Sequence, residues 1–342
     1  MNKNNSGDRE LLTNLLRISA EPCICIDDKQ VHGYVTDNPV EYFQYVKTCL
    51  KDLAEGKASL EMTPKQIFTD NGYEGDFRVM PCVIRRNGTV SKTVKIVGTN
   101  IQQSVVPDQI TVGKAFAIHP QDNFISHEFY GCLLSSARTG ICAAIAIDLL
   151  AGSVSRLTII GAGRVGYYAA LYACATANIR EVNIQDDQKE RAGYMAELLG
   201  KEFPDIRFNA IDEIGQANSD VIVLATTSKE AVCSPDDSSA SLVISLGADT
   251  DDQHELHEDW VGKADFFVDT MDSARFGDLS LWQKSGLISL DDLTDLFSVL
   301  RKPSEIQERG KVFVSTGSAI FDNITIAYML SKLPVSQPSS DI

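Results

Sequence analysis

The stretch LTIIGAGRVGYYAA, residues 157–170, decides the fold of this chain. A run of apolar residues typical of a buried strand meets three glycines, Gly161, Gly163 and Gly166, in the spacing G-x-G-x-x-G, and a helical pattern follows. The first glycine permits a tight turn, the second lets a pyrophosphate approach the backbone, and the third lets the helix pack closely on the strand. Because a helix N-terminus offers free N–H groups and a positive dipole end, this context predicts a dinucleotide-binding loop.

An acidic residue follows at the end of the next predicted strand, EVNIQD (residues 181–186). There we expect Asp186 to accept hydrogen bonds from ribose hydroxyls and to repel a 2′-phosphate, which favours NAD over NADP. Asp187 is the alternative acid by one position, and Arg164 and Lys189 are basic residues of the kind that a 2′-phosphate would need. Further cofactor contacts are expected from Arg164 and Val165 in the glycine loop, and from Thr226, Thr227 and Gly247 at the carboxyl ends of later strands.

Strands and helices alternate from residue 156 to the end of the chain. The predicted strands are short and almost continuously apolar, which is typical of parallel strands buried on both faces. We therefore expect an α/β fold with a Rossmann-type, doubly wound parallel sheet. Helices are expected at 164–177 and 188–201, near 255–263, and in IFDNITIAYMLSKL after the last strand.

The N-terminal part of the chain has a different pattern. Residues 38–56 predict an amphipathic helix that ends at Gly56, and residues 61–130 contain short β-branched and aromatic runs separated by turn signals such as Asn87-Gly88. This indicates a second, mainly β domain with hairpins. Residues 133–151 then predict a helix that is apolar nearly all round and hence buried.

Composition excludes several classes of function. With 31 basic and 47 acidic residues the formal charge is −16, which argues against nucleic-acid binding and predicts a solvated acidic surface. The longest apolar runs stop short of the ~20 residues of a membrane span, and the N-terminus has no signal-peptide core, so we expect no membrane association and a cytoplasmic protein. The eight cysteines and five histidines are scattered without zinc-ligand spacing, and no metal site is expected.

Six motifs along the chain carry a family resemblance. They are LAEGKA (53–58), VMPCV (79–83) followed by VKIVGTN (94–100), SSARTGICAA (135–144), IIGAGRVG (159–166), SLGADTDDQHEL (245–256) and STGSAIFDNITIAYML (315–330). In this order they cover nearly the whole chain from about residue 22. The chain thereby resembles the ornithine cyclodeaminase/μ-crystallin family of NAD(P)-dependent amino-acid oxidoreductases.

The resemblance implies a division of labour along the chain. Residues 1–130, completed by 317–342, would form a substrate-binding and dimerisation domain, and residues 131–316 an NAD-binding Rossmann domain. The active site would lie in the cleft between them. The implied protein is an enzyme that uses NAD, takes a small amino-acid substrate and forms a homodimer.

The resemblance also implies roles for four charged residues. Arg138 would hold the substrate carboxylate bidentately, and Lys95 would contact the same region and help to move a proton. Asp249 would meet the substrate amine as a base or as an orienting group. Lys65 stands where many members have an arginine after a proline, so the carboxylate clamp at this position would be a point charge. Asp322 is expected to cap or brace the last helix near the cofactor.

Each of these residues also has an ordinary structural interpretation. Arg138 at the start of a buried helix is compatible with a structural ion pair, and Lys95 on a half-buried strand with a side chain that reaches solvent. Asp249, in the acidic run ADTDD, is compatible with a turn or a helix N-cap.

The predicted chemistry is hydride transfer from Cα of an amino acid to NAD⁺, which leaves an imine. Attack by an internal amine would give cyclodeamination of the ornithine type, and attack by water would give a 2-oxo acid, as in alanine dehydrogenase. The reverse reaction would reduce ketimines, and some relatives release 2,3-diaminopropionate from an N-substituted glutamate. The alternative from a different class is a μ-crystallin-like protein that binds NAD(P)H without turnover.

Overall fold

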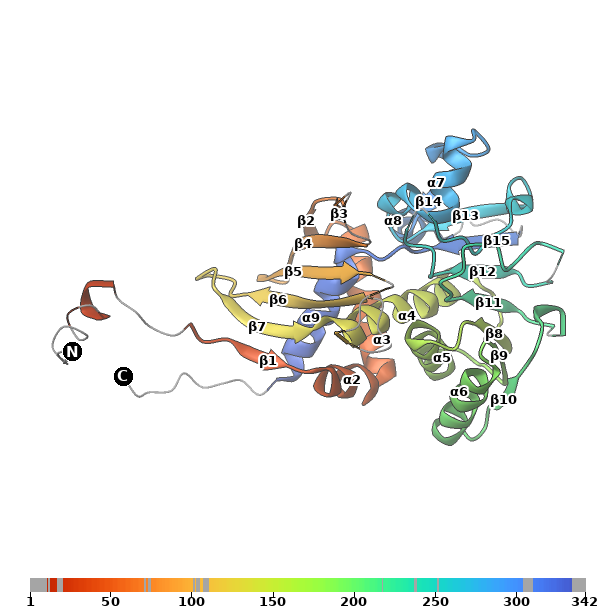
Figure 1. Ribbon diagram of the computed structural model, residues 1–342, viewed down its shortest axis with the longest axis horizontal. Helices are drawn as coiled ribbons and strands as arrows, with labels where there is room; N and C mark the ends of the chain where they lie inside the picture. The colour runs from red at the N-terminus through yellow and green to blue at the C-terminus, as the bar shows by residue number, and fades with distance from the viewer. Residues whose placement is uncertain are drawn as a thin grey trace.

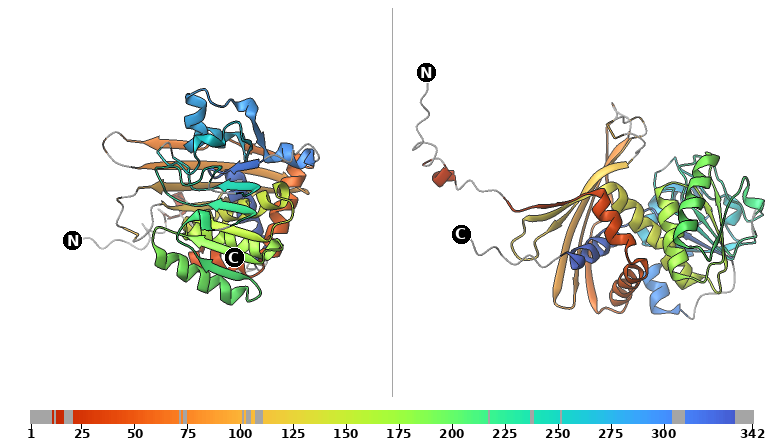
Figure 2. Two further views of the ribbon diagram at one scale, coloured as in Figure 1. Left: turned by 90° about the vertical axis from the view of Figure 1, so that its right-hand side faces the viewer. Right: turned by 90° about the horizontal axis from the view of Figure 1, so that it is seen from below.

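The protein, described here as a computed structural model, consists of two β-sheets with helices packed between them (Figure 1; Figure 2, right). The structure describes residues 11, 13–16, 21–70, 72, 75–100, 102, 105–106, 111–216, 218–236, 239–250, 252–303 and 310–333.

The first sheet confirms the predicted β region. Within the described residues it joins seven strands in the order β1-β7-β6-β5-β4-β2, with β3 also paired to β4. Neighbours are antiparallel except β1, which runs parallel to β7. The β4–β5 turn is the predicted Asn87-Gly88, with φ angles of 51° and 75° that suit a tight hairpin. The strands are β1 (Ile24–Ile26), β2 (Ala58–Met62), β3 (Gln66–Thr69), β4 (Asp76–Arg86), β5 (Thr89–Thr99), β6 (Thr111–Ile118) and β7 (Ile125–Tyr130).

The second sheet confirms the doubly wound α/β class. Its eight described strands are all parallel, in the order β10-β9-β8-β11-β12-β15-β13-β14. The edge strand β14 was not predicted. The strands are β8 (Arg156–Ile160), β9 (Glu181–Gln185), β10 (Arg207–Ala210), β11 (Val221–Leu224), β12 (Leu242–Ser245), β13 (Ala264–Val268), β14 (Leu293–Asp295) and β15 (Gly310–Val314).

Most of the described helices fall where the sequence predicts them, but the helix at 28–36 was not predicted, and one predicted helix is wrong, as given below. The helix predicted at 38–56 is α3, which begins after the side-chain cap of Asn38 and is followed by Gly56 at a φ of 73°. The helices are α2 (Asp28–Thr36), α3 (Pro39–Ala54), α4 (Gly131–Leu150), α5 (Arg164–Thr176), α6 (Lys189–Glu202), α7 (Gly277–Lys284), α8 (Leu296–Arg301) and α9 (Ala319–Lys332).

Successive side chains of the parallel strands point to opposite faces of the sheet, so the core consists of two clusters. Val221 and Val223 of β11 join the larger cluster, which continues through α4, α5 and α9 to the inner face of the first sheet. Ile222 and Leu224 join a second cluster on the opposite face of the parallel sheet. Because every residue of such a strand is buried, the near-continuous apolar runs in the sequence are explained.

Helix α4 connects the two sheets. It packs against β6 of the first sheet on one side and against α5 and β12 on the other. By length and composition alone, this 20-residue helix could cross a membrane, and it is longer than the apolar run seen in the sequence. Most of it is buried within the fold, as expected for the core helix of a two-sheet protein.

The helix predicted near 255–263 is wrong. Cys233 and Leu256 form an isolated parallel bridge, so the chain is extended there, and only a 3₁₀ turn follows at Glu258–Trp260. The physical reason is Glu255. Its side chain is fully buried and accepts four hydrogen bonds, whereas a helix on the surface would leave it exposed.

Candidate active site

A cavity of about 950 Å³ lies between the inner face of the first sheet and the carboxyl edge of the parallel sheet. Both sheets and α4 contribute to its wall. Ten of the residues singled out from the sequence line it, namely Lys65, Lys95, Arg138, Gly163, Arg164, Val165, Thr226, Thr227, Gly247 and Asp249. Residues from distant parts of the chain are therefore brought to one site.

The glycine loop forms one end of the cavity. Gly161 has a φ of 102°, which favours glycine, and a Cβ on Gly166 would overlap the carbonyl oxygen of Gly161. Gly163 caps α5 without any side-chain hydrogen bond, and a Cβ there would meet open space. The N–H groups of the first turn are thus presented to a ligand, and the residues present fit a dinucleotide pyrophosphate.

Asp186 lies behind this loop, at the end of β9. One of its carboxylate oxygens accepts from the backbone N–H of Ala162 at 2.7 Å, and the other from that of Gln188 at 2.8 Å. These bonds fix the acid at the position where the ribose hydroxyls of NAD are recognised in such folds. Lys189 is paired with Asp212 at 2.6 Å.

A buried acid that sequence reasoning missed organises the opposite wall. Glu255 accepts hydrogen bonds from the backbone N–H and the hydroxyl of Thr226, from the hydroxyl of Ser245 and from the backbone N–H of Gly247, at 2.7–2.9 Å. Thr226 and Gly247 therefore line the cavity in positions set by Glu255. The only signal in the sequence is an acidic residue within the motif SLGADTDDQHEL.

Lys95 and Arg138 share one carboxylate at the base of the cavity. Nζ of Lys95 donates to Oδ1 of Asp322 at 2.8 Å, and Nε of Arg138 lies 3.0 Å from the same oxygen. Burial, reinforced by the charge of Arg138, lowers the pKa of Lys95 to about 7. Asp322 was expected to cap or brace the last helix, but the side-chain cap of α9 is Ser318, and Asp322 holds the two cations instead.

The guanidinium of Arg138 fits against a glycine and has an N–H donor without a partner. Gly317 has a φ of 84°, and a Cβ there would overlap the guanidinium. Nη1 of Arg138 is buried and has no hydrogen-bond partner among the described residues. Since a buried donor without a partner is costly, this nitrogen is suited to receive a ligand carboxylate.

Lys65 reaches the same region from the first sheet. Its Nζ donates to the carbonyl oxygen of Thr316 at 2.7 Å and lies 4.4 Å from the centre of the Phe276 ring. Burial lowers its pKa to about 8. The lysine is therefore a point charge inside the cavity, as the sequence predicts for this position.

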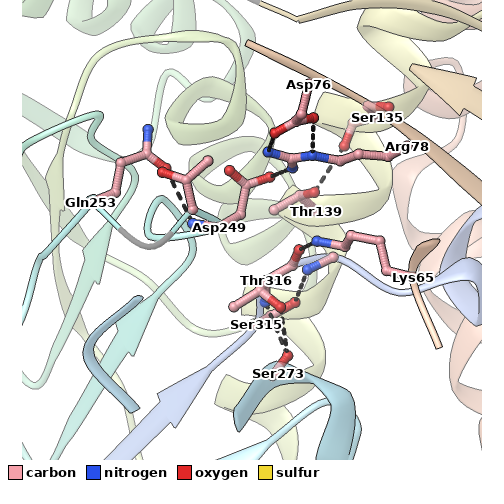
Figure 3. Close-up of polar contacts among 12 residues, drawn as sticks. Lys65, Asp76, Arg78, Ser135, Thr139, Asp249, Gln253, Ser273, Ser315 and Thr316 are labelled. Atoms are coloured by element: carbon pink, nitrogen blue, oxygen red, sulfur yellow. Dashed lines mark hydrogen bonds and ion pairs between the residues drawn. The ribbon is translucent and has the colours of Figure 1, made fainter. Parts of the chain in front are cut away.

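Asp249 faces the cavity from the loop after β12, and its side chain is 36% exposed (Figure 3). Nη1 of Arg78 donates to Oδ2 of Asp249 at 2.6 Å, and the backbone N–H of Asp249 donates to Gln253 at 3.2 Å. Burial alone would raise the pKa of Asp249, but the charges of Arg78 and Lys65 outweigh it and hold the pKa below its ordinary value.

Arg78 is a charged residue of the cavity wall that was not singled out from the sequence. Its side chain is 4% exposed, and its Nε and Nη2 donate to the two oxygens of Asp76 at 2.7 and 3.0 Å (Figure 3). The sequence carried one signal: in the strand-like run DFRVMPCV, Arg78 shares a face with Met80 and Cys82. An arginine on an apolar face requires ionic partners.

Comparison with known proteins gives three kinds of match. A model of the ornithine cyclodeaminase/mu-crystallin family matches residues 30–333. An uncharacterized protein of Schizosaccharomyces pombe is 32% identical over 175 residues, which is 48% of this chain. The chain spans about half the length of that curated relative, with 53% of it covered.

Solved structures of similar fold include three oxidoreductases. One is Thermococcus litoralis Δ1-pyrroline-2-carboxylate reductase in complex with NADH and L-proline, 21% identical, with 90% of this chain and 97% of that chain covered and a TM-score of 0.80. An archaeal alanine dehydrogenase dimer with bound NAD is also 21% identical (90% and 95% covered, TM-score 0.77). The iminosuccinate reductase of Paracoccus denitrificans with NAD⁺ is 19% identical (91% and 96% covered, TM-score 0.75). At these identities the likeness establishes the fold.

Proposed function

The chain belongs to the ornithine cyclodeaminase/mu-crystallin family, and from this premise we propose that it is an NAD-dependent oxidoreductase acting on the Cα–N bond of an amino or imino acid. One observation carries the proposal. Arg138 and Lys65, which suit a carboxylate, and Asp249, which suits an amine, line the same cavity as the N-terminus of α5. A zwitterion held between these groups lies beside a dinucleotide on the glycine loop.

The reaction requires removal of a proton and a hydride from the substrate. NAD⁺, when bound, supplies the hydride acceptor. The substrate ammonium must first lose a proton so that its lone pair can form the C=N bond as the Cα–H bond breaks. The products are an iminium ion, NADH and a proton. In the reverse direction the same groups assist reduction of an imine.

Lys95 is the better base of the two candidates. Its lowered pKa of about 7 leaves much of the amine neutral near physiological pH, and an acceptor works best when its pKa lies close to the working pH. The pKa of Asp249 is held low by Arg78 and Lys65, so its carboxylate stays ionised and accepts protons poorly. Asp249 therefore orients the substrate amine and stabilises the positive charge of the iminium.

The cofactor is proposed to be NAD. Gly161, Gly163 and Gly166 fit its pyrophosphate, with Arg164 and Val165 in the first turn of α5, and Asp186 is fixed for its ribose hydroxyls. Thr226, Thr227 and Gly247 complete the wall. Three structures of similar fold are solved with NAD or NADH, which supports this choice.

The fate of the imine separates the remaining candidates. Cyclisation by an internal amine, hydrolysis to a 2-oxo acid, ketimine reduction and release of 2,3-diaminopropionate from an N-substituted glutamate all start from the same first step. The solved relatives include a lysine cyclodeaminase that recognises lysine, ornithine and 2,4-diaminobutyric acid, as well as the alanine dehydrogenase.

A homodimer is part of the proposal. The face of the first sheet turned away from the helices exposes Ile96 (42%) and a stacked pair, Phe68 and Phe77, with ring centres 4.7 Å apart. Apolar side chains exposed together on one face are typical of an interface. We assign residues 1–130 and 317–342 to substrate binding and dimerisation, residues 131–316 to NAD binding, and the protein to the cytoplasm.

The experiment combines cofactor binding with product analysis. NADH fluorescence on mixing with the purified protein measures binding, and absorbance of the nicotinamide band is followed with amino acids, or with 2-oxo acids plus ammonia. Mass analysis of products from ornithine, lysine and N-substituted glutamates detects cyclodeamination, which causes no net change in NADH. Binding of NADH without conversion of any compound would instead favour the μ-crystallin-like alternative.

A further inference from the structure

One part of the cavity wall carries polar groups that the reaction at Cα does not use. Arg78 on β4 pairs in register with Val97 on β5, whereas Lys95 pairs with Met80. All four side chains line the cavity. At ~3.3 Å per residue, Arg78 lies about 7 Å along the sheet from the level of Lys95. A carbon chain that starts at the level of Lys95 and spans this distance would reach Arg78.

Arg78 has hydrogen-bonding capacity left. A guanidinium has five N–H groups. Asp76 takes one from Nε and one from Nη2, and Asp249 takes one from Nη1. One N–H remains on each terminal nitrogen, which is the arrangement that binds a planar carboxylate.

Two hydroxyls at the same end of the cavity also lack partners. Oγ1 of Thr99, at the end of β5, and Oγ of Ser135, in α4, are both buried and make no hydrogen bond to any residue within the described ranges. Both residues line the cavity. Since buried polar atoms in proteins are nearly always paired, two orphan hydroxyls beside an arginine indicate a polar ligand group.

The charge around the substrate end supports an anionic group. Four basic residues line it, Lys65, Arg78, Lys95 and Arg138, against one acidic residue, Asp249. Asp76 and Asp322, outside the lining, pair with three of the four cations. The α-carboxylate of an amino acid occupies Arg138 and Lys65. It leaves Arg78 without a ligand partner of its own.

We propose that Arg78, Thr99 and Ser135 form a subsite for a second carboxylate, so that the substrate is an acidic amino or imino acid. This inference rests on the proposed function. The second carboxylate is carried either by the side chain or by a substituent on the nitrogen, because Arg78 also touches Asp249, which faces the amine. Arg78, Thr99 and Ser135 thereby determine specificity and take no part in the hydride step.

The direct test measures binding to the NADH-bound protein, with fluorescence or calorimetry as the readout. Glutarate is compared with its monoamide glutaramate, and iminodiacetate with its own monoamide. Each pair is similar in size and differs by one carboxylate. The dicarboxylate of at least one pair is expected to bind about tenfold or more tightly, as for a charge-assisted contact in a buried site. If the dicarboxylate binds more tightly in the glutarate pair, the second carboxylate belongs to the substrate side chain. If it binds more tightly in the iminodiacetate pair, the second carboxylate belongs to a substituent on the nitrogen.

Variants separate this role from support of Asp249. Thr99→Val and Ser135→Ala preserve shape and charge, and each is expected to reduce the preference several-fold, while Arg78→Gln abolishes it. Arg85→Gln is the matched control, because Arg85 is on the same strand but is 49% exposed and paired with Glu61. Equal affinities within both pairs in the unmodified protein would overturn the proposal. The proposal would also be overturned if Arg78→Gln weakened the binding of the acid and of the amide equally and the two hydroxyl variants had no effect.

Failure of the subsite and failure of the proposed function give different results. Oxidation of neutral amino acids with a kcat/KM above that of acidic ones would overturn the subsite and leave the proposed function standing. A preference for dicarboxylates in binding, with no turnover of any amino or imino acid, would leave the subsite standing and overturn the function.

Discussion

Oδ1 of Asp322 accepts a hydrogen bond from Nζ of Lys95 at 2.8 Å, in a place where both side chains are almost completely buried. The carboxylate stabilises the protonated form of the buried lysine, whereas the adjacent Arg138 disfavours a second positive charge beside it. Burial, together with the charge of Arg138, outweighs the effect of Asp322 and lowers the pKa of Lys95 from 10.5 to about 7. The site therefore contains an amine that changes charge near neutral pH.

The pH dependence of oxidation follows from this pKa. As pH rises through about 7, Lys95 loses its proton and becomes able to accept one from the substrate, so kcat/KM for amino-acid oxidation is expected to rise and then level off. Imine reduction needs the protonated lysine and is expected to fall over the same range. In Lys95→Arg the side chain stays charged, so activity should be lost at every pH and the rise of kcat/KM with pH should disappear. An unchanged profile in this variant would assign the titration to another group.

Arg138→Ala tests the carboxylate clamp. Loss of a buried charge-assisted contact costs roughly 2–4 kcal/mol, so KM should rise by a factor of about 30 to 1,000, while the affinity for NADH stays nearly unchanged. Steady-state kinetics and NADH fluorescence give the two numbers. Arg138→Lys keeps the charge but loses the planar fork, and it should recover only part of the affinity. A matching loss of NADH binding would place Arg138 at the cofactor instead.

The sequence predicts those parts of the site that depend on local patterns. The glycine loop, Asp186 and the parallel strands are read from spacing and periodicity within a few tens of residues. The partner of Asp249 is different, because Arg78 lies 171 positions away and meets it only when the two sheets come together. An isolated sequence position does not reveal whether an acid acts as a free base or is held by an arginine.

Glu255 illustrates the same limit for the fold. In an acidic stretch its local pattern favours an exposed helix, which explains the wrong prediction at 255–263. Its burial is stabilised by donors on Thr226, Ser245 and Gly247, which are brought together only by the parallel order of β11 and β12. Long-range pairing decides whether such a charge is buried.

Glu255→Gln tests how much this acid contributes to stability. An amide cannot accept from donors at both of its ends, so at least one buried N–H or O–H loses its partner, at a cost of about 1–3 kcal/mol. A fall in Tm of several degrees is expected by differential scanning fluorimetry. Asp259→Asn, on the same stretch but 53% exposed, is the control and should change Tm little. Equal Tm values for both variants would show that the four contacts to Glu255 contribute little.

The choice between NAD and NADP depends on one carboxylate. Asp186→Ala removes the expected acceptor for the ribose hydroxyls and the repulsion of a 2′-phosphate, so NAD should bind about tenfold or more weakly and the preference over NADP should shrink. Asp187→Ala is the matched control, because Asp187 is adjacent and exposed. Titration of both cofactors measures the ratio. The opposite pattern, with the effect at Asp187, would move the assignment by one residue.

The outer face of the first sheet predicts the oligomeric state. Ile96 on β5 pairs in register with Val79 on β4, so the exposed isoleucine lies within an apolar surface that also includes Phe77. A buried aspartate at its centre would be left unpaired, and Ile96→Asp is therefore expected to convert a dimer into monomers. Light scattering after size-exclusion chromatography gives the mass. Leu290→Asp, at an exposed leucine outside this sheet, should leave the dimer intact. A dimer that survives Ile96→Asp at micromolar concentration would mean that the subunits associate through another surface.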